Sequence, residues 1–159
     1  MVRFGVTGHM NITEATAPLV YESIRRLFAG EDSAELVGVS CIARGADSVF
    51  AQAVLDAAGR LEVVLPSRNY RQEKVKPEHV ELFDNLVGLA AEVRTMPFEN
   101  AGREAYEAAN EAVLSSCDRL VAVWDGATGK RGGTASVVDS ARRRGVRVDV
   151  VWPEGAQRG

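Results

Sequence analysis

The sequence predicts an α/β protein in which a mostly parallel sheet of about six strands lies between two layers of helices. Short apolar segments rich in β-branched residues alternate with segments whose apolar residues recur every three to four positions. Most of the short segments are continuous apolar runs, which is typical of strands buried on both faces. No internal repeat or linker interrupts the alternation. We therefore expect one Rossmann-like, three-layer α/β/α domain over residues 1–152 and a C-terminal tail at residues 153–159.

The first two strand–helix pairs follow from residue type and spacing. Residues 2–6 have the length and the β-branched content of a buried strand. After a group of cap-type side chains, apolar residues at helical spacing predict a helix that ends near residue 29. A strand at residues 36–40 and a helix at about residues 47–58 repeat the pattern, and Gly59 is expected to end this helix.

The remaining elements continue the alternation. Residues 61–65 form an apolar run that Pro66 stops. The polar segment at residues 67–77 is expected to be the longest loop, and helical spacing resumes over residues 80–87. The further expected elements are a strand at 92–96, a helix at 102–116, a strand at 119–124, a helix at 134–144 and a strand at 146–152.

The composition argues against several classes of function. Lys and Arg number 19 and Asp and Glu 22, a net charge of −3, so the chain lacks the basic surplus that nucleic acids or anionic membranes usually require. No apolar run approaches the roughly 20 residues that cross a bilayer, and the N-terminus does not resemble a signal peptide. Cys41 and Cys117 form no metal-binding or redox motif. We therefore expect a cytoplasmic protein with no metal, no cofactor and no membrane contact; the net charge disfavours nucleic acid as a partner but leaves room for a local basic patch.

Three loops carry the candidate chemistry. In an open parallel sheet the loops that follow the strands lie along one rim, and ligands bind there near the point where the strand order reverses. The loops at residues 7–11, 40–47 and 125–134 each follow an expected strand. We therefore expect all three to lie on the ligand-binding rim.

The third loop has the composition of a phosphate-binding turn. Its two adjacent glycines let the backbone approach an anion closely, and the free N–H groups and the dipole of the following helix favour negative charge. A threonine hydroxyl can donate a further hydrogen bond, and Lys130 or Arg131 can add positive charge. The alternative is a glycine turn needed only to enter the helix. The candidate ligand contacts in this loop are Asp125, Gly126, Lys130, Gly132, Gly133 and Thr134.

Two common nucleotide motifs are absent from these loops. Residues 126–130 have the wrong glycine spacing for a Walker A motif, and Arg131 stands where a Ser or Thr would bind magnesium. The first loop has neither the spacing nor the helix start of the G-x-G-x-x-G fingerprint. ATP hydrolysis and dehydrogenase chemistry with NAD are therefore disfavoured.

The second loop offers an arginine and a carboxylate beside a tight turn. Arg44, followed by Gly45, is suited to a phosphate or carboxylate, and Asp47 could accept a hydrogen bond from a ribose hydroxyl. For Asp47 the alternative is a helix cap, because carboxylates are common in the first turn of a helix. Ser40, at the end of a strand, has a similar alternative.

Candidate contacts also occur outside the glycine-rich segments. Gly8 and His9 follow the first strand; the histidine is a proton donor, a ligand contact or simply a local hydrogen-bonding residue, and has no obvious carboxylate partner in the sequence. Tyr106 and Asn110 lie one turn apart on the face of their helix that also carries Val113. They either reach the ligand or make their hydrogen bonds within the core.

These loops together resemble the SLOG superfamily, the Rossmann-like group that includes the LOG phosphoribohydrolases and the DNA-processing protein A family. The resemblance rests on Gly5-Val-Thr-Gly-His9, on residues 40–47 and on residues 123–126 with 132–134, and it covers nearly the whole chain. It implies a pocket for a nucleotide or a nucleotide-derived ligand. In that pocket Gly132, Gly133 and Thr134 would contact the phosphate, and Gly8, Ser40, Arg44, Gly45 and Asp47 would surround the rest. Members of the group commonly pair through helices, which implies a homodimer.

The resemblance leaves three functions open. The phosphoribohydrolases carry a glutamate three residues after the threonine of the phosphate loop, and here that position is Val137. A nucleotide-binding module that acts as a sensor or carrier is therefore the first hypothesis. The second is hydrolysis of the N-glycosidic bond of a nucleoside 5′-monophosphate, with Glu104 or Glu107 replacing the missing carboxylate. The third is binding of single-stranded DNA, which fits less well because the chain is acidic and shows no aromatic platform beside a basic stripe.

Overall fold

Six parallel strands form one sheet in the order β4-β3-β2-β1-β5-β6. The computed structural model describes residues 2–128 and 133–159. The chain builds outward from β1 through β2 and β3 to β4, then crosses to the other side of β1 to form β5 and β6. The strand order therefore reverses between β1 and β5. The strands are β1 Val2–Gly8, β2 Leu36–Ser40, β3 Arg60–Leu65, β4 Glu92–Thr95, β5 Arg119–Val123 and β6 Arg147–Val151.

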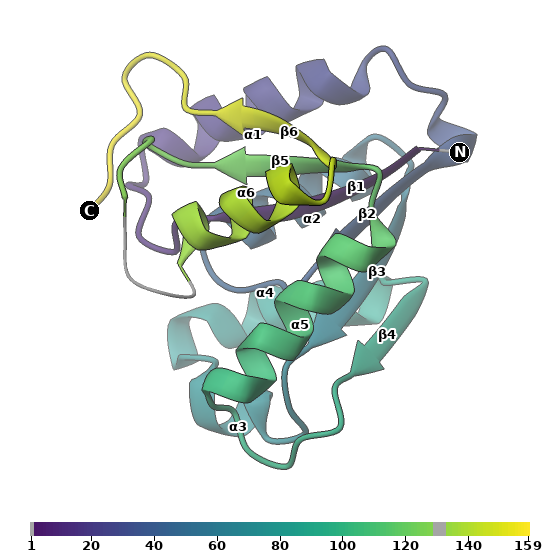
Figure 1. The fold of residues 1–159 in the computed structure, drawn as a ribbon, viewed down its shortest axis with the longest axis vertical. Coiled ribbons are helices and arrows are strands. Elements are labelled where there is room, and N and C mark those ends of the chain that lie inside the picture. Colours follow the sequence, from purple (N-terminus) through teal and green to yellow (C-terminus); the bar gives the residue numbers. More distant parts are fainter. Residues whose placement is uncertain (1, 129–132) are drawn as a thin grey trace.

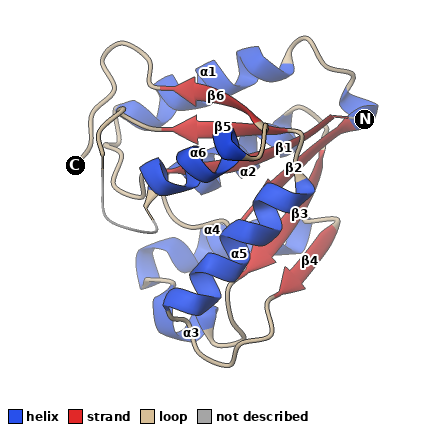
Figure 2. Cartoon of the chain, viewed as in Figure 1, coloured by secondary structure: helices blue, strands red, loops and turns tan. Residues whose placement is uncertain are grey.

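Helices cover both faces of the sheet (Figures 1 and 2). Helices α5 and α6 lie on the near face in this view, and α1, α2 and α4 lie on the far face. This confirms the predicted three-layer α/β fold with a parallel sheet of six strands. The helices are α1 Thr16–Phe28, α2 Ala46–Asp56, α3 Tyr70–Lys74, α4 Pro77–Leu89, α5 Arg103–Ser116 and α6 Thr134–Arg143, with a short 3-10 helix η1 at Ser33–Glu35.

Two local expectations are wrong. The polar segment after β3 is not all loop, because it contains α3, whose first residue, Tyr70, is buried. Helix α2 ends at Asp56, and the residue that takes the left-handed conformation after it is Ala58, with φ of 58°, rather than Gly59. Gly59 has a different role: a Cβ there would lie 2.9 Å from a side-chain carbon of Leu36, so the absence of a side chain permits close packing.

Two glycines bring the start of α2 against the end of β1. A Cβ on Gly8 would lie 2.5 Å from the Cβ of Ala46, and a Cβ on Gly45 would lie 2.7 Å from the backbone oxygen of His9. Gly45 also has a φ of 79°, a backbone angle that residues with a side chain rarely adopt. The Ala46 N–H donates to the His9 carbonyl at 3.2 Å. These contacts fix the loops after β1 and β2 side by side.

The C-terminal segment is docked rather than free. Residues Ile12 and Arg158 form an antiparallel bridge. The Thr13 N–H donates to the Gln157 carbonyl at 3.1 Å, and the Gln157 N–H donates to the Thr16 hydroxyl at 2.8 Å. Thr16 is fully buried beneath this contact. The segment predicted as a tail therefore packs on the chain between β1 and α1.

No helix within residues 2–128 and 133–159 is long and apolar enough to cross a membrane. Within the same ranges, no three His, Cys, Asp or Glu side chains gather in a way that could hold a metal ion.

Candidate functional site

A cavity of about 790 Å³ lies at the carboxyl ends of β1, β2, β3 and β5. Its wall includes Thr7 and Gly8 at the end of β1, Cys41 after β2, Pro66 after β3 and Trp124 after β5. The point where the strand order reverses, between β1 and β5, is therefore part of this cavity. Ligands of open parallel sheets bind at such points, so the fold makes this cavity the candidate site.

Helix α6 begins on the cavity wall without a side-chain cap. Gly133 is the N-cap residue, and among the residues that the structure describes no side-chain cap hydrogen bond is made at this helix start. Gly133, Thr134 and Ala135 line the cavity, and the first backbone hydrogen bond of the helix runs from the Val137 N–H to the Gly133 carbonyl at 3.2 Å. The N–H groups before residue 137 have no acceptor within the helix, and at a helix start on the cavity wall such groups and the helix dipole favour an anion.

Asp47 is the one acidic residue on the cavity wall within the described ranges. It lies in the first turn of α2. Burial raises the pKa of its carboxyl to about 7, although a hydrogen bond from the Ala43 backbone acts in the opposite direction. Asp47 is therefore partly protonated near neutral pH, so it can donate as well as accept a hydrogen bond.

Two tyrosines form an aromatic corner of the cavity. Tyr70 from α3 and Tyr106 from α5 meet edge to face, with ring centroids 6.2 Å apart. Burial raises the pKa of Tyr70, and the negative charge of Asp47 raises it further, so this phenol stays protonated. Burial also raises the pKa of Tyr106. The corner offers an aromatic ring and two hydroxyl groups to a ligand.

His9, which also lines the cavity, contacts the start of the loop after β5. The Asp125 N–H donates to Nε2 of His9 at 3.2 Å, so this imidazole is neutral with its proton on Nδ1. Burial and the positive charge of Arg158 lower the pKa of His9, and Asp125 opposes them. The histidine also has the carboxylate neighbour that the sequence did not reveal, because Oδ1 of Asp125 lies 3.3 Å from Nε2. Asp125 turns the chain by accepting from the Ala127 N–H at 2.9 Å.

The structure brings seven of the predicted site residues together on the cavity wall. They come from β1, α2, α5 and α6, which are distant in the sequence. They are Gly8, His9, Asp47, Tyr106, Asn110, Gly133 and Thr134.

Other predicted residues lie elsewhere. Ser40 is buried, accepts from the Ile42 N–H and donates to the Asp47 carbonyl, both at 3.0 Å, so it shapes the loop. Arg44 and Gly45 line a second groove of about 550 Å³ between α1, α2 and α4. Asp125 and Gly126 stand outside the cavity wall as described, and Lys130 and Gly132 lie outside the described residues.

Several cavity residues were not predicted from the sequence. Tyr70 and Lys74 come from α3, and Arg158 comes from the C-terminal segment. The signal for α3 was weak, because one apolar residue in a polar run shows no periodicity. Arg158 reaches the site only through contacts with Asn11, Ile12 and Asp125, more than 30 residues away in the sequence.

The chain matches no protein-family model and no curated protein. Its fold is similar to that of DNA processing protein A from Streptococcus pneumoniae, with a TM-score of 0.71 and 19% identity; the match covers 98% of this chain and 52% of that protein. The chain therefore spans about half the length of that relative. It is also similar to DNA processing protein A from Helicobacter pylori, a protein described as binding single-stranded DNA (TM-score 0.70, 15% identity, 99% of this chain and 68% of that one).

A third similar structure is the Moco carrier protein from Chlamydomonas reinhardtii, with a TM-score of 0.57, 19% identity and coverage of 96% of this chain and 78% of that protein. The chain therefore shares with these proteins the Rossmann-like α/β fold that the sequence predicted.

Proposed function

We propose that the protein binds a nucleotide or a nucleotide-derived ligand in the 790 Å³ cavity and acts as a sensor or carrier. The observation that carries the proposal is the start of α6 on the cavity wall with Gly133 as N-cap and no side-chain cap. A phosphate there accepts hydrogen bonds from the open N–H groups and lies at the positive end of the helix dipole. The likeness to a Moco carrier protein and to a protein that binds single-stranded DNA supports a nucleotide-related ligand.

The rest of the cavity suits a nucleoside. The Tyr70–Tyr106 corner offers an aromatic surface for a base, and Asn110 offers an amide donor and acceptor on the same helix as Tyr106. Asp47 is placed to hydrogen-bond a ribose hydroxyl or a base edge. Together these groups give one apolar surface and several polar contacts, the usual composition of a small-molecule site.

The test is a thermal-shift series with AMP, IMP, ADP-ribose, NAD, cyclic dinucleotides and inorganic phosphate, on the wild type and on Gly133→Asp. A ligand at about 100 times its Kd should stabilise the wild type by about 2.7 kcal/mol. In Gly133→Asp the new carboxylate caps α6 and takes the donors of the phosphate, so the ligand effect should vanish while the unliganded protein keeps its stability.

Gly102→Asp is the matched control. Gly102 is the N-cap of α5, likewise without a side-chain cap, and no atom lies within 4 Å of a Cβ built there. This variant should respond to the ligand like the wild type. A panel in which no compound stabilises the wild type, or a Gly133→Asp protein that still responds, would contradict the proposal.

The second candidate function is hydrolysis of a nucleoside 5′-monophosphate to base and ribose 5-phosphate. Val137 lines the cavity, whereas Glu104 and Glu107 are exposed and stand outside its described wall. Asp47 is the acid placed for the reaction, and its raised pKa suits transfer of a proton to the leaving base. The test is chromatography for free adenine after incubation with AMP; release by the wild type and none by Asp47→Asn would support hydrolysis.

Binding of single-stranded DNA is the third candidate, supported by the likeness to the Helicobacter pylori protein. Fluorescence anisotropy with a labelled oligonucleotide tests it, because such binding weakens steeply with salt. Binding that AMP displaces would place the strand in the cavity. No change in anisotropy at moderate salt would remove this candidate.

We also propose that the protein is a cytoplasmic homodimer. Light scattering tests the assembly, since a monomer has a mass of 17.1 kDa. Fractionation of cells with an antibody against the protein tests the location.

A further inference from the structure

The C-terminal segment carries a cation to the cavity wall. In Figure 1 the C-terminus lies at the end of the sheet toward which the arrowheads of β5 and β6 point, the same end as the cavity. Arg158 lines this cavity. Its backbone is held by the antiparallel bridge to Ile12 and, on either side, by hydrogen bonds of Gln157 and Gly159 to residues 11–16.

The Arg158 side chain is held in one orientation and keeps free donors. Its Nε donates to Oδ1 of Asn11 at 3.1 Å, and Nη1 lies 3.6 Å from Oδ2 of Asp125. A guanidinium has five N–H groups, so these two contacts leave three for another partner. The side chain is 44% exposed, which leaves it accessible from the cavity. A prepositioned fork of this kind suits the two oxygens of a phosphate or carboxylate.

Lys74 is the other cation on the described part of the cavity wall, and it differs in kind. It is an exposed residue at the end of the five-residue helix α3, on the tyrosine side of the cavity. Its side chain has no hydrogen bond or ion pair with any residue that the structure describes, so it is not held in place. Arg158 is therefore the cation that the fold positions.

We propose that Arg158 pairs with an anionic group of the ligand and makes the site selective for phosphorylated over unphosphorylated compounds. This inference rests on the proposed function and assigns a residue outside the three motif loops to the same cavity. The phosphate lies between two sources of positive potential, the start of α6 and the guanidinium. Stabilisation of the fold through the ion pair with Asp125 does not account for an arginine at position 158, because exposed ion pairs contribute little to stability.

The experiment is calorimetric titration of AMP, adenosine and inorganic pyrophosphate into the wild type, Arg158→Gln, Arg158→Lys and Arg147→Gln at one salt concentration. Arg147 begins β6 at the opposite rim, is exposed and pairs with Asp149 at 3.5 Å, so its variant controls for the loss of one positive charge. We expect Arg158→Gln to weaken AMP binding roughly 10- to 100-fold and adenosine binding less than about twofold. Arg158→Lys keeps the positive charge but not the forked guanidinium, so its AMP affinity should lie between those of the wild type and Arg158→Gln. Arg147→Gln should match the wild type.

The outcomes separate this inference from the proposed function. Equal weakening of AMP and adenosine in Arg158→Gln would overturn the inference, because it would show that Arg158 only supports the structure of the site. Pyrophosphate binding that depends on Arg158, with no binding of AMP or adenosine, would uphold the inference and overturn the nucleotide proposal. No binding of any probe to the wild type would overturn both.

Discussion

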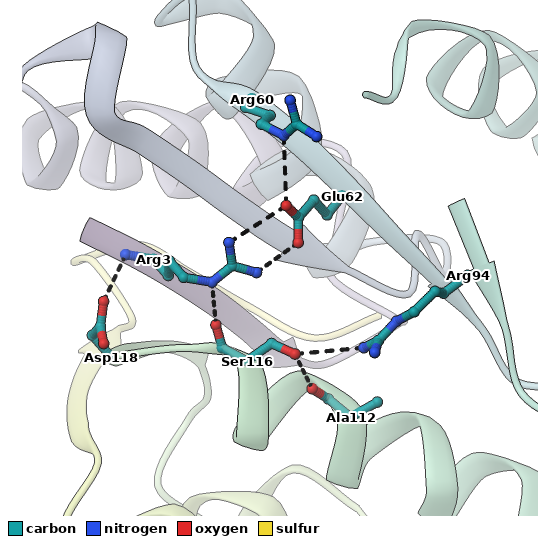
Figure 3. Close-up of polar contacts among 7 residues, drawn as sticks. All are labelled: Arg3, Arg60, Glu62, Arg94, Ala112, Ser116 and Asp118. Carbon is teal, nitrogen blue, oxygen red and sulfur yellow. Dashed lines mark hydrogen bonds and ion pairs between the residues drawn. The ribbon is translucent and has the colours of Figure 1, made fainter. Parts of the chain in front are cut away.

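The two rims of the sheet carry similar polar and charged side chains, but these side chains are paired at the amino rim and partly unpaired at the carboxyl rim. At the amino rim, Arg3 donates through Nη2 to Glu62 at 2.6 Å, and its backbone N–H donates to Asp118 at 3.0 Å (Figure 3). Arg60 lies 3.6 Å from the same Glu62 carboxylate. The Ser116 hydroxyl donates to the Ala112 carbonyl at 2.6 Å and accepts from Arg94. Each charged group in Figure 3 therefore has a partner.

At the carboxyl rim several polar side chains of the cavity have no partner among the described residues. The side chains of Lys74, Tyr106, Asn110 and Thr134 form no hydrogen bond or ion pair with any described residue, and α6 begins without a side-chain cap. Burial raises the pKa of Asp47 to about 7, and no cation among residues 2–128 and 133–159 pairs with this carboxyl. Paired charges stabilise a fold, whereas prepositioned groups without partners are available to a ligand. This difference is the one expected if the carboxyl rim binds a ligand, as we propose.

The largest expected effect on stability comes from Asp47. A carboxyl with a pKa near 7 in the folded protein and 3.8 as its ordinary value binds its proton more tightly when folded. The contribution of the protonated Asp47 carboxyl to the free energy of unfolding is therefore fully present below about pH 4, and it is lost as the pH rises to about 7. Asp47→Asn removes this dependence. Urea unfolding should find the variant about as stable as the wild type at pH 4 and about 2–4 kcal/mol more stable at pH 8.

Glu104→Gln is the control for Asp47→Asn. Glu104 is also in the first turn of a helix, α5, but it is exposed and outside the described cavity wall. In Glu104→Gln the free energy of unfolding at neutral pH should fall by a few tenths of a kcal/mol, because a favourable interaction with the helix dipole is lost. The variant should not be more stable than the wild type at pH 8. A difference between Asp47→Asn and the wild type that is the same at all pH values would show that Asp47 is not an unpaired buried acid.

Breaking the amino rim should have the next largest effect and the opposite sign. In Arg3→Gln the Glu62 carboxylate, 15% exposed, loses its main partner, so the free energy of unfolding at pH 7 should fall by about 2 kcal/mol. The hydrogen bond from Arg3 lowers the pKa of Glu62, so this contribution is present above the ordinary pKa of 4.5 and disappears as the pH falls below it. Ligand binding should not change.

Arg142→Gln controls for the loss of an arginine. Arg142 is exposed in the last turn of α6. Its variant should change stability by less than about 0.5 kcal/mol. If Arg3→Gln cost no more than Arg142→Gln, the amino rim would not be the structural rim.

The sequence predicted the fold well because most of the strands are continuous apolar runs. The strand at residues 36–40 coincides with β2, and its buried residues need no long-range information to be recognised. Helix α3 was missed because its five residues, Tyr70–Lys74, include one apolar side chain and four polar ones. The left-handed residue after α2 is Ala58, which no preference for glycine would have indicated.

The site was harder to predict because it depends on contacts between distant residues. Gly133 and Thr134, which loop composition singled out, line the cavity, and the start of a helix is a local feature that a sequence can indicate. Arg44 and Asp47 are three residues apart, but one lines the groove by α1 and the other the cavity, because the chain turns at Gly45 between them. His9 and Asp125 are 116 residues apart, and nothing in the sequence around either residue indicates that they are in contact.

The smallest effects on stability should come from a pair of substitutions on one helix. Asn110 and Ser116 are both in α5, but Asn110 lines the cavity and Ser116 belongs to the amino rim. Ser116→Ala removes the hydrogen bonds with Ala112 and Arg94 and should lower the free energy of unfolding by about 1 kcal/mol, with ligand affinity unchanged. Asn110→Ala removes no hydrogen bond to a described residue and should change stability by less than about 0.5 kcal/mol. It should weaken AMP binding roughly 5- to 10-fold, because it removes an amide that the ligand would contact. Urea unfolding and calorimetric titration of both variants measure these effects, and a reversed pattern would mean that the open polar groups serve the fold rather than a ligand.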